Sequence, residues 1–393
     1  MSYRIATLNK ISPKGLALFG SDYEVADGLS SPDAILVRSA QLDTDTYPGL
    51  LAVARAGAGV NNITVDKAAA AGVCVFNTPG ANANAVAELV FAAMGAGVRN
   101  ILAGIAFAKA TADTVETDKD LDAAMEKGKS KFAGSELAGK TLGVIGLGKI
   151  GILVANLGIK HGMDVVAFDP FPSIDNIHQL APEAKMVKSM AEVAAAADLL
   201  TVHIPLMDAT RGTVDAAFLA NMKDGAILVN YSRGPIVKEA DVIAALDAGK
   251  LAKYLCDFPS KALVKHAKVT CTPHLGASTE ESEENCATMA VAELKGYLTL
   301  GNVVNSVNFP AVELAPAAGT KARLAVVLKP VADAMASVNS ALSAAGISAS
   351  AIAAKSGKKA GYALVDVAGD LSQAAVDAVA KSADVIRTRV IRF

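Results

Sequence analysis

The sequence has no tryptophan and only four cysteines, at positions 74, 256, 271 and 286. The cysteines are scattered and no two of them have a CxxC spacing, which excludes a disulfide framework and a cysteine-based zinc site. We therefore expect reduced thiols, a cytoplasmic location and no bound metal.

Long apolar runs and long basic runs are also absent. No apolar stretch reaches the roughly 20 residues that a membrane-spanning helix needs, and the start, MSYRIATLNK, does not resemble a signal peptide. The formal net charge of −2 disfavours nucleic acids and membrane surfaces as partners. What is present is a globular composition, 52% hydrophobic and 19% charged, and the 393 residues predict two or three domains.

The most informative stretch is 140–169, which reads KTLGVIGLGKIGILVANLGIKHGMDVVAFD. A strand-length apolar run leads into Gly146-x-Gly148-x-x-Gly151, then an amphipathic helical segment and a second apolar run that ends in Asp169. In a dinucleotide-binding unit, one glycine makes the turn, one admits the pyrophosphate to the backbone, and one lets the helix approach the strand. The pyrophosphate then lies at the helix N-terminus. Asp169 can bind the adenosine ribose and repel a 2′-phosphate, so NAD is favoured over NADP; the alternative is a glycine turn in another α/β protein.

The residues before this motif predict a small α/β domain. Short apolar runs at 4–8, 34–37, 51–54 and 73–76 alternate with helical or loop segments. Arg38 and Arg55 follow two of these runs, and ligands bind at strand ends in open α/β sheets. From the sequence alone, both arginines are equally compatible with ordinary solvated surface charges.

The residues after Asp169 continue the parallel-sheet pattern, with apolar runs separated by helical segments. Runs at 198–204, 226–230, 253–256 and 269–272 predict further strands, and 189–197 and 238–248 predict helices. Arg233, Asp257 and His274 follow three of these strands, so all three should lie at one carboxyl edge. Such an edge is suited to catalysis.

The remaining segments complete the predicted organisation. Residues 83–100 and 279–300 predict long helices, 109–131 a charged and solvated helical segment, and 310–320 a linker. The predicted fold is α/β, with a doubly wound parallel-sheet (Rossmann) cofactor domain, 97–276, inserted in a smaller flavodoxin-like substrate domain, 1–96 and 277–316. Residues 321–393 predict a ferredoxin-like βαββαβ domain.

Several ordered motifs resemble those of the D-isomer-specific 2-hydroxyacid dehydrogenases: RAGAGVNNI, VFNTPGANANAVAEL, GVIGLGKIG, VNYSRGPIV and TPHLGASTEESEEN. The C-terminal segments VNSALSAAGI and IRTRVIRF resemble the ACT domain found in some members. The resemblance implies NAD-dependent oxidation of 3-phospho-D-glycerate to 3-phosphonooxypyruvate, the first step of serine biosynthesis. It also implies a homo-oligomer, a dimer or larger, that associates through the nucleotide-binding domain.

The resemblance assigns roles by position. Arg233 matches the arginine that binds the substrate carboxylate and carbonyl, and His274 matches the general acid/base; the ordinary pKa of histidine, about 6.5, suits proton transfer. The substrate-binding positions are Arg38, Ser39, Gly57, Ala58, Gly59 and Asn82. The cofactor-binding positions are Gly146, Gly148, Lys149, Ile150, Gly151, Asp169, Pro205, Tyr231, Ser232, Asp257, Gly276 and Ala277.

Two departures from the family pattern leave questions open. The family places a glutamate shortly after the aspartate that matches Asp257, but residues 257–262 read DFPSKA. Either His274 works without that partner or it uses another carboxylate, such as Glu280 or Glu281. The first turn of the ACT-like segment, 328–332, lacks the polar and glycine residues that bind serine in the family, so an interface role is as well supported as regulation.

Two alternative functions remain at this point. One is a dehydrogenase or reductase for another D-2-hydroxy acid, such as glycerate, glyoxylate or lactate; here discrimination depends on a phosphate site near Arg38 and Ser39, with Lys129 or Lys131 as further candidates. The other is a non-catalytic NAD-sensing protein that resembles the C-terminal-binding-protein co-repressors. The ACT-like segment argues against the second alternative.

Overall fold

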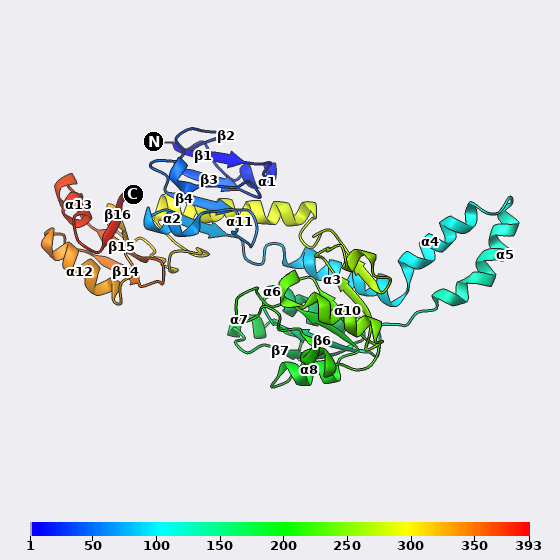
Figure 1. Ribbon diagram of the computed structural model, residues 1–393. Coiled ribbons are helices and arrows are strands. Elements are labelled where there is room, and N and C mark those ends of the chain that lie inside the picture. Colours follow the sequence, from blue (N-terminus) through cyan, green and yellow to red (C-terminus); the bar gives the residue numbers. More distant parts are fainter. Residues whose placement is uncertain (1) are drawn as a thin grey trace. The chain divides into compact units, whose positions relative to one another are not determined.

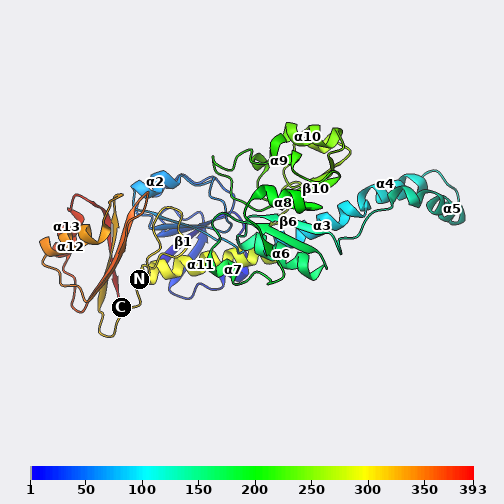
Figure 2. The same cartoon turned by 90° about the horizontal axis from the view of Figure 1, so that it is seen from below.

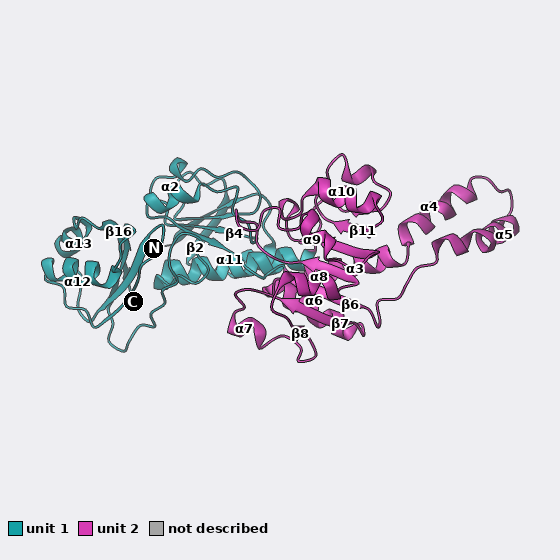
Figure 3. Ribbon diagram, turned by 60° about the horizontal axis from the view of Figure 1, so that its bottom comes forward, with its two compact units in different colours: residues 1–82, 280–393 teal, residues 83–279 magenta. Residues whose placement is uncertain are grey.

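The computed structural model describes residues 2–393, which form two compact units (Figure 3). The first unit joins the two ends of the chain, Met1–Asn82 and Glu280–Phe393, and the second is the continuous segment Ala83–Thr279. The predicted fold class is confirmed, because a doubly wound parallel sheet is inserted between the two parts of another α/β unit. The domain boundaries given in the sequence analysis stay predictions.

The first sheet contains five strands, and all of their pairings are parallel. In spatial order they are β2 (Tyr23–Asp27), β1 (Tyr3–Leu8), β3 (Ala34–Val37), β4 (Ala52–Arg55) and β5 (Cys74–Asn77). This is the flavodoxin-like order, in which ligands bind at the carboxyl edge where β1 and β3 diverge. Short elements connect the strands: α1 (Pro13–Leu16), η1 (Thr44–Thr46) and α2 (Val65–Ala70).

The inner strands of this sheet are apolar because helices cover both of its faces. Helix α11 (Glu280–Leu300) covers one face, where Ala287 shares a core with Leu36. Helix α2 covers the other face, where Ala68 shares a core with Ile35. The sequence pattern did not predict β2, since this edge strand reads YEVAD and none of its residues is buried.

The second sheet contains seven strands, again with parallel pairings only. In spatial order they are β12 (Val269–Cys271), β11 (Leu251–Cys256), β10 (Ala226–Asn230), β9 (Leu199–Val202), β6 (Thr141–Ile145), β7 (Asp164–Phe168) and β8 (Lys185–Met186). The strand order reverses between β6 and β9, which is the position where doubly wound sheets bind dinucleotides. The connecting elements are α6 (Lys149–Lys160), α7 (Ile174–Ile177), α8 (Met190–Ala196), α9 (Ala216–Ala220), η3 (Gly234–Ile236), α10 (Glu239–Asp247) and η4 (Leu263–Lys265).

Helix α3 (Ala83–Val98) belongs to the second unit along its whole length. It packs against α6, and both helices contribute to one core. It also approaches β11 so closely that a Cβ added at Gly97 would lie 3.0 Å from a methyl group of Leu255. The units therefore divide before α3, whereas the sequence analysis placed a boundary at 96/97.

A helical hairpin follows α3. It consists of α4 (Ile101–Ala112), α5 (Asp118–Gly128) and the 3₁₀ turn η2 (Lys129–Phe132). Figure 1 and Figure 2 both show α4 and α5 side by side and away from the second sheet. None of the residues of α4 is buried, although the helix reads ILAGIAFAKATA.

In residues 2–393, no single helix is both long and apolar enough to cross a bilayer. Helices α3 and α4 are bent by 57° relative to each other. They reach the length and apolar composition of a membrane-spanning segment only when the two helices are taken together.

The C-terminal module is an antiparallel sheet with two helices. Its chain order is β13 (Ala322–Leu328), α12 (Ala334–Ala344), β14 (Ala351–Lys355), β15 (Gly361–Val367), α13 (Gln373–Ala380) and β16 (Val385–Arg392). Its spatial order is β14-β15-β13-β16, which is that of a ferredoxin-like sheet. Every residue of β13 and β15 is buried, because α12 and α13 cover one face and the rest of the first unit covers the other.

Arginines and a tyrosine of this module hydrogen-bond to backbone carbonyls of the first unit. Arg389 donates to the carbonyls of Tyr297 and Leu298 in the last turn of α11, the latter at 2.9 Å. The Tyr362 hydroxyl donates to the carbonyl of Gly301 at 2.7 Å. Helix C-terminal carbonyls lack intrahelical partners and carry partial negative charge, so these donors fit them well. The module is therefore fixed to α11.

One buried carboxyl group in α11 predicts a pH-dependent stability. Glu293 is buried, and its Oε1 accepts a 2.7 Å hydrogen bond from Asn305, while its Oε2 has no partner among the described residues. Burial raises the pKa of Glu293 from 4.5 to about 7. Because the folded state holds the proton more tightly, the stabilisation is fully present below pH 4.5 and is lost as the pH rises to about 7.

We expect Glu293→Gln to be more stable than the parent protein at pH 8, by at least about 1 kcal/mol, because the amide cannot ionise. Thermal unfolding at pH 5 and pH 8 measures this difference. Glu24→Gln, at an exposed ion pair with Arg4, is the matched control and should not change the pH dependence. An equal effect of Glu293→Gln at both pH values would contradict the expectation.

Candidate active site

The glycine loop after β6 has the geometry of a dinucleotide-binding turn. Gly146 has a φ of +94°, and a Cβ there would lie 2.5 Å from the carbonyl oxygen of His203. A Cβ at Gly151 would lie 1.9 Å from the carbonyl oxygen of Gly146, so α6 can start this close to β6 only with glycine. Gly148, at the N-cap of α6, faces open space. The open glycine at a helix N-terminus leaves backbone N–H groups accessible to a pyrophosphate.

Asp169 lies beside this loop, at the end of β7. Its Oδ2 accepts a 2.7 Å hydrogen bond from the backbone N–H of Leu147, and its Oδ1 accepts a 2.8 Å bond from the N–H of Phe171. These bonds fix the carboxylate relative to the glycine loop. Each carboxylate oxygen retains a lone pair, so a ribose hydroxyl could still donate to it.

The three predicted rim residues lie at one edge of the second sheet. Asn230 in β10 pairs with Cys256 in β11, which in turn pairs with Cys271 in β12, so the three strands end at the same level. Arg233, Asp257 and His274 follow these strands directly or within three residues.

Phe258 contacts both the loop of Arg233 and the His274 side chain. A Cβ at Gly234, next to Arg233, would lie 3.1 Å from the Cβ of Phe258. The Phe258 ring in turn packs against the His274 imidazole, with 5.2 Å between ring centroids. The two catalytic candidates are therefore brought together by the fold.

Asp257 holds the loop that carries His274. Its carboxylate is buried and accepts hydrogen bonds from the Thr272 hydroxyl at 2.5 Å and from the N–H groups of Leu275 and Gly276, both at 2.8 Å. His274 has a φ of +59°, which residues other than glycine rarely adopt. The bonds to Asp257 maintain this conformation, so the structure assigns Asp257 a positioning role. Its contact with the cofactor stays a prediction.

Arg233 projects from a similarly fixed loop. The side chain of Asn230 donates to the carbonyl of Arg233 at 3.0 Å and accepts from the N–H of Ser232 at 3.1 Å. The Ser232 hydroxyl donates to the carbonyl of Ile204 at 2.5 Å. The exposed guanidinium uses Nη1 to reach the carbonyl of Ser232, and most of its five donors remain available for a carboxylate.

His274 has no carboxylate partner among residues 2–393, because none of the ion pairs or side-chain hydrogen bonds there includes its imidazole. The missing family glutamate is therefore not replaced within the second unit. Glu280 and Glu281 belong to the first unit.

The predicted substrate-binding residues of the first unit lie at its carboxyl sheet edge. Val37 in β3 pairs with Arg55 in β4, so Arg38 and the loop that starts at Gly57 are neighbours. The Arg55 Nε donates to the carbonyl of Arg38 at 3.0 Å, and a Cβ at Gly57 would lie 2.5 Å from an Arg55 Nη1. The glycine thus makes room for the Arg55 guanidinium. From the sequence alone, Arg55, like Arg38, was equally compatible with an ordinary surface charge.

Neighbouring contacts fix the rest of this edge. Asn77 donates to the carbonyl of Ala58 at 2.5 Å, and the Asn9 side chain accepts from the N–H of Ser39 at 3.0 Å. Arg38 makes a 2.6 Å ion pair with Glu283, in the first turn of α11. The side chain of the predicted residue Asn82, which ends this segment of the first unit, makes no hydrogen bond to any other residue in 2–393.

Other titratable groups near the second sheet are poor acid/base candidates. Burial lowers the pKa of His203 to about 4, and its Nε2 lies 3.0 Å from the Thr201 hydroxyl. Burial raises the pKa of Tyr231 to about 12.

Lys129, a further phosphate candidate from the sequence, pairs with Glu126 on the helical hairpin. In residues 2–393, no group of three or more His, Cys, Asp or Glu side chains is placed to hold a metal ion.

Comparisons with known proteins agree with this geometry. Residues 105–276 match the NAD-binding domain of D-isomer specific 2-hydroxyacid dehydrogenases. The D-3-phosphoglycerate dehydrogenase of Bacillus subtilis (strain 168) is 34% identical over 330 residues, covering 79% of this chain and 60% of that protein. The enzyme of the same name from Mycobacterium tuberculosis (strain ATCC 25618 / H37Rv) is 36% identical, covering 76% of this chain and 58% of that protein. The chain thus spans no more than 60% of either relative.

Solved structures show the same fold. The NAD⁺-bound 3-phosphoglycerate dehydrogenase of Entamoeba histolytica matches with a TM-score of 0.61 and 25% identity, covering 78% of this chain and 99% of that one. The apo D-mandelate dehydrogenase of Rhodotorula graminis matches with a TM-score of 0.66 and 24% identity, covering 78% and 98%. The second likeness supports the fold alone.

Proposed function

We propose that this chain, which belongs to the D-isomer-specific 2-hydroxyacid dehydrogenase family, oxidises 3-phospho-D-glycerate at C2 to 3-phosphonooxypyruvate. Its cofactor is NAD, because residues 105–276 match the NAD-binding domain of that family. The observation that carries the proposal is the common edge of β10, β11 and β12, where Arg233 follows β10 and His274 follows β12, the two strands that flank β11. In this proposal the reaction supplies the first step of serine biosynthesis, in the cytoplasm.

The glycine loop and Asp169 would hold the cofactor. NAD⁺, when bound, supplies the hydride acceptor. Gly148 and the first turn of α6 offer backbone N–H groups to its pyrophosphate, and Asp169 offers acceptors to its ribose. A 2′-phosphate would meet the Asp169 charge at short range, which favours NAD over NADP.

Arg233 and His274 carry the chemistry at C2. The imidazole of His274 accepts the proton of the C2 hydroxyl as the hydride departs. The Arg233 guanidinium binds the carboxylate with its planar fork of donors and stabilises the negative charge that develops on the C2 oxygen. Asp257 acts through His274, because its carboxylate fixes the backbone of the loop that carries the imidazole.

We assign the substrate phosphate to Arg38 and Arg55 of the first unit. The two residues lie at one strand edge, where the Arg55 side chain donates to the Arg38 backbone carbonyl, and guanidinium groups match phosphate geometry in a bidentate manner. Arg38 is paired with the Glu283 carboxylate at 2.6 Å, an exposed pair that a doubly charged phosphate can replace.

Helix α4 is apolar, yet none of its residues is buried. We therefore also propose that the chain forms a dimer or larger homo-oligomer, and sedimentation velocity would measure its oligomeric state.

The function is tested with a panel of D-2-hydroxy acids assayed by NADH absorbance. We expect 3-phospho-D-glycerate to have a kcat/KM well above those of glycerate, lactate and the reverse substrate glyoxylate. A higher kcat/KM for an unphosphorylated acid would assign the chain to another substrate in the same family. NADH binding without turnover of any acid would favour a sensor.

We expect Arg38→Ala to raise the KM for 3-phospho-D-glycerate roughly 10- to 100-fold, since a charge-assisted bond contributes about 1.5–3 kcal/mol. The KM for D-glycerate should change little, because that acid lacks the phosphate. Arg4→Ala, which removes another exposed ion-paired arginine from the same sheet, is the matched control. An equal rise in both KM values would show that Arg38 does not bind the phosphate.

A further inference from the structure

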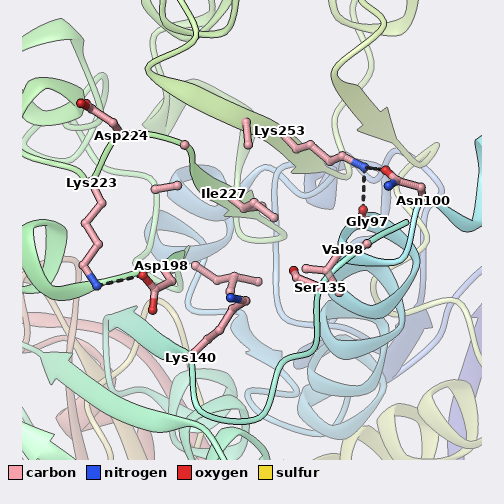
Figure 4. A pocket seen from close by; sticks show the side chains of 15 residues that line it. Gly97, Val98, Asn100, Ser135, Lys140, Asp198, Lys223, Asp224, Ile227 and Lys253 are labelled. Atoms are coloured by element: carbon pink, nitrogen blue, oxygen red, sulfur yellow. Dashed lines mark hydrogen bonds and ion pairs between the residues drawn. The ribbon is translucent and has the colours of Figure 1, made fainter. Parts of the chain in front are cut away.

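The second unit contains a pocket of about 340 Å³ at the amino ends of its strands. Figure 4 shows its lining, which comes from the end of α3, the segment before β6, and the starts of β9, β10 and β11. The glycine loop, Arg233 and His274 lie at the carboxyl ends of these strands. The pocket is therefore separate from the candidate active site, and its volume suits a small molecule.

The floor of the pocket is apolar and its rim is charged. Val98, Leu199 and Ile227 line it together with small residues, while lysine and aspartate side chains surround it. Figure 4 shows Lys140, Lys223 and Lys253 on different sides of the pocket.

Two ion pairs account for the carboxylates of the rim. Lys223 pairs with Asp198 at 2.8 Å, and Asp198 also accepts a 2.8 Å bond from the N–H of Thr141. Asp224 pairs at 2.8 Å with Lys250, outside the pocket, and its side chain is 90% exposed. These carboxylates are neutralised by partners other than Lys140 and Lys253.

Lys140 and Lys253 are thus two cations that form no ion pair, although the Asp198 carboxylate, itself paired with Lys223, lies near enough to Lys140 for the lysine charge to help lower the pKa of Asp198. In residues 2–393, no carboxylate lies within ion-pair distance of either ammonium group. The Lys253 ammonium is partly buried and donates to the Gly97 carbonyl at 2.6 Å and to Asn100 Oδ1 at 2.5 Å. One of its three N–H donors remains, and Lys140 keeps its own donors.

The Lys253 ammonium has only neutral hydrogen-bond acceptors around it, so a bound anion would stabilise its charge. Burial lowers the pKa of Lys253, because its charge is removed from water without an opposite charge nearby. Its two acceptors are a neutral carbonyl and a neutral amide, which also hold it in place. A bound anion would supply the missing charge and occupy the remaining donor.

We propose that this pocket binds a small anion bearing phosphate or carboxylate groups, held by Lys140 and Lys253 over the apolar floor. The anion is distinct from the substrate, because the pocket lies at the opposite edge of the sheet from His274. It binds at the amino ends of β9, β10 and β11 and stabilises the second unit.

Crystals of the full chain soaked in tungstate, a heavy analogue of phosphate, locate the site directly. We expect anomalous density in the pocket, within hydrogen-bond distance of the Lys140 and Lys253 ammonium groups. Density near Arg38 alone would overturn the proposal, since it would show that only the proposed substrate site takes the anion.

Isothermal titration with inorganic phosphate and with citrate, at ionic strength matched by sodium chloride, measures the affinity. The titrations use NADH-saturated Arg38→Ala protein, which removes the contributions of the cofactor site and of Arg38; anion binding at Arg55 or Arg233 is recognised because it persists when Lys140 is replaced. Tighter binding of phosphate identifies a phosphate ligand, and tighter binding of citrate identifies a carboxylate ligand. Binding of neither anion would overturn the proposal.

Lys140→Met is the informative variant, because its ammonium group makes no hydrogen bond to any residue that the structure describes, 2–393. We expect it to weaken anion binding roughly tenfold, as the loss of one charge-assisted bond predicts. Lys160→Met, at an exposed lysine in the last turn of α6, should change the affinity less than about twofold. Equal effects of Lys140→Met and Lys160→Met would show that the pocket is not the binding site.

Discussion

Replacing His274 by alanine is expected to lower kcat by about two to four orders of magnitude and to leave NADH affinity nearly unchanged. The imidazole of His274 is the proposed general acid/base at the carboxyl edge of the second sheet, and His203 is a poor alternative because burial lowers its pKa to about 4. The glycine loop and Asp169, which would hold the cofactor, have no bond to His274. Stopped-flow fluorescence measures NADH binding, and steady-state absorbance measures kcat.

The control for this prediction is His178→Ala, which removes another histidine of the second unit, at the C-cap of α7. It should keep both kcat and NADH affinity. If His274→Ala kept more than about a tenth of the parent kcat, proton transfer would have to involve another group.

Replacing Arg323 by methionine is expected to destabilise the first unit by about 3–5 kcal/mol, because it leaves a buried carboxylate without its partner. Arg323 and Asp366 are both fully buried and form a bidentate pair between β13 and β15, with N–O distances of 2.6 and 2.8 Å. Arg323 also donates to the carbonyl of Leu300 at the end of α11, at 2.7 Å. Differential scanning calorimetry measures the transition of the first unit.

The double variant Arg323→Met/Asp366→Leu separates the ion pair from packing. Two apolar side chains of similar volume avoid the unpaired charge, so most of the lost stability should return. A loss below about 1 kcal/mol in the single variant would mean that the carboxylate finds water or another partner.

The fixed position of the C-terminal module bears on its role. Its sheet has no free face, because helices cover one side and the first unit covers the other. Arg389 and Tyr362 tie it to α11, whose first turn pairs Glu283 with Arg38. These contacts favour a structural role for the module.

Local sequence patterns predicted the inner strands and the order of the site residues. Apolar runs of strand length predicted β3 and β10 to the residue, because buried parallel strands are nearly continuous apolar runs. The spacing of Gly146, Gly148 and Gly151 predicted the turn, since only glycine fits the close contacts at Gly146 and Gly151. Parallel strands also predicted that Arg233 and His274 share an edge, because all their carboxyl ends point the same way.

Contacts between segments that are distant in the sequence determine the partners of the charged side chains and the edge strand β2. Arg323 pairs with Asp366, Glu283 pairs with Arg38, and the Asp257 carboxylate turns inward to hold the His274 loop instead of facing outward. The edge strand β2 escaped prediction because its residues are held by backbone pairing with β1 and not by an apolar pattern. A pattern along the chain records whether a residue is buried, whereas the partner of a buried charge depends on which other segment the fold brings to it.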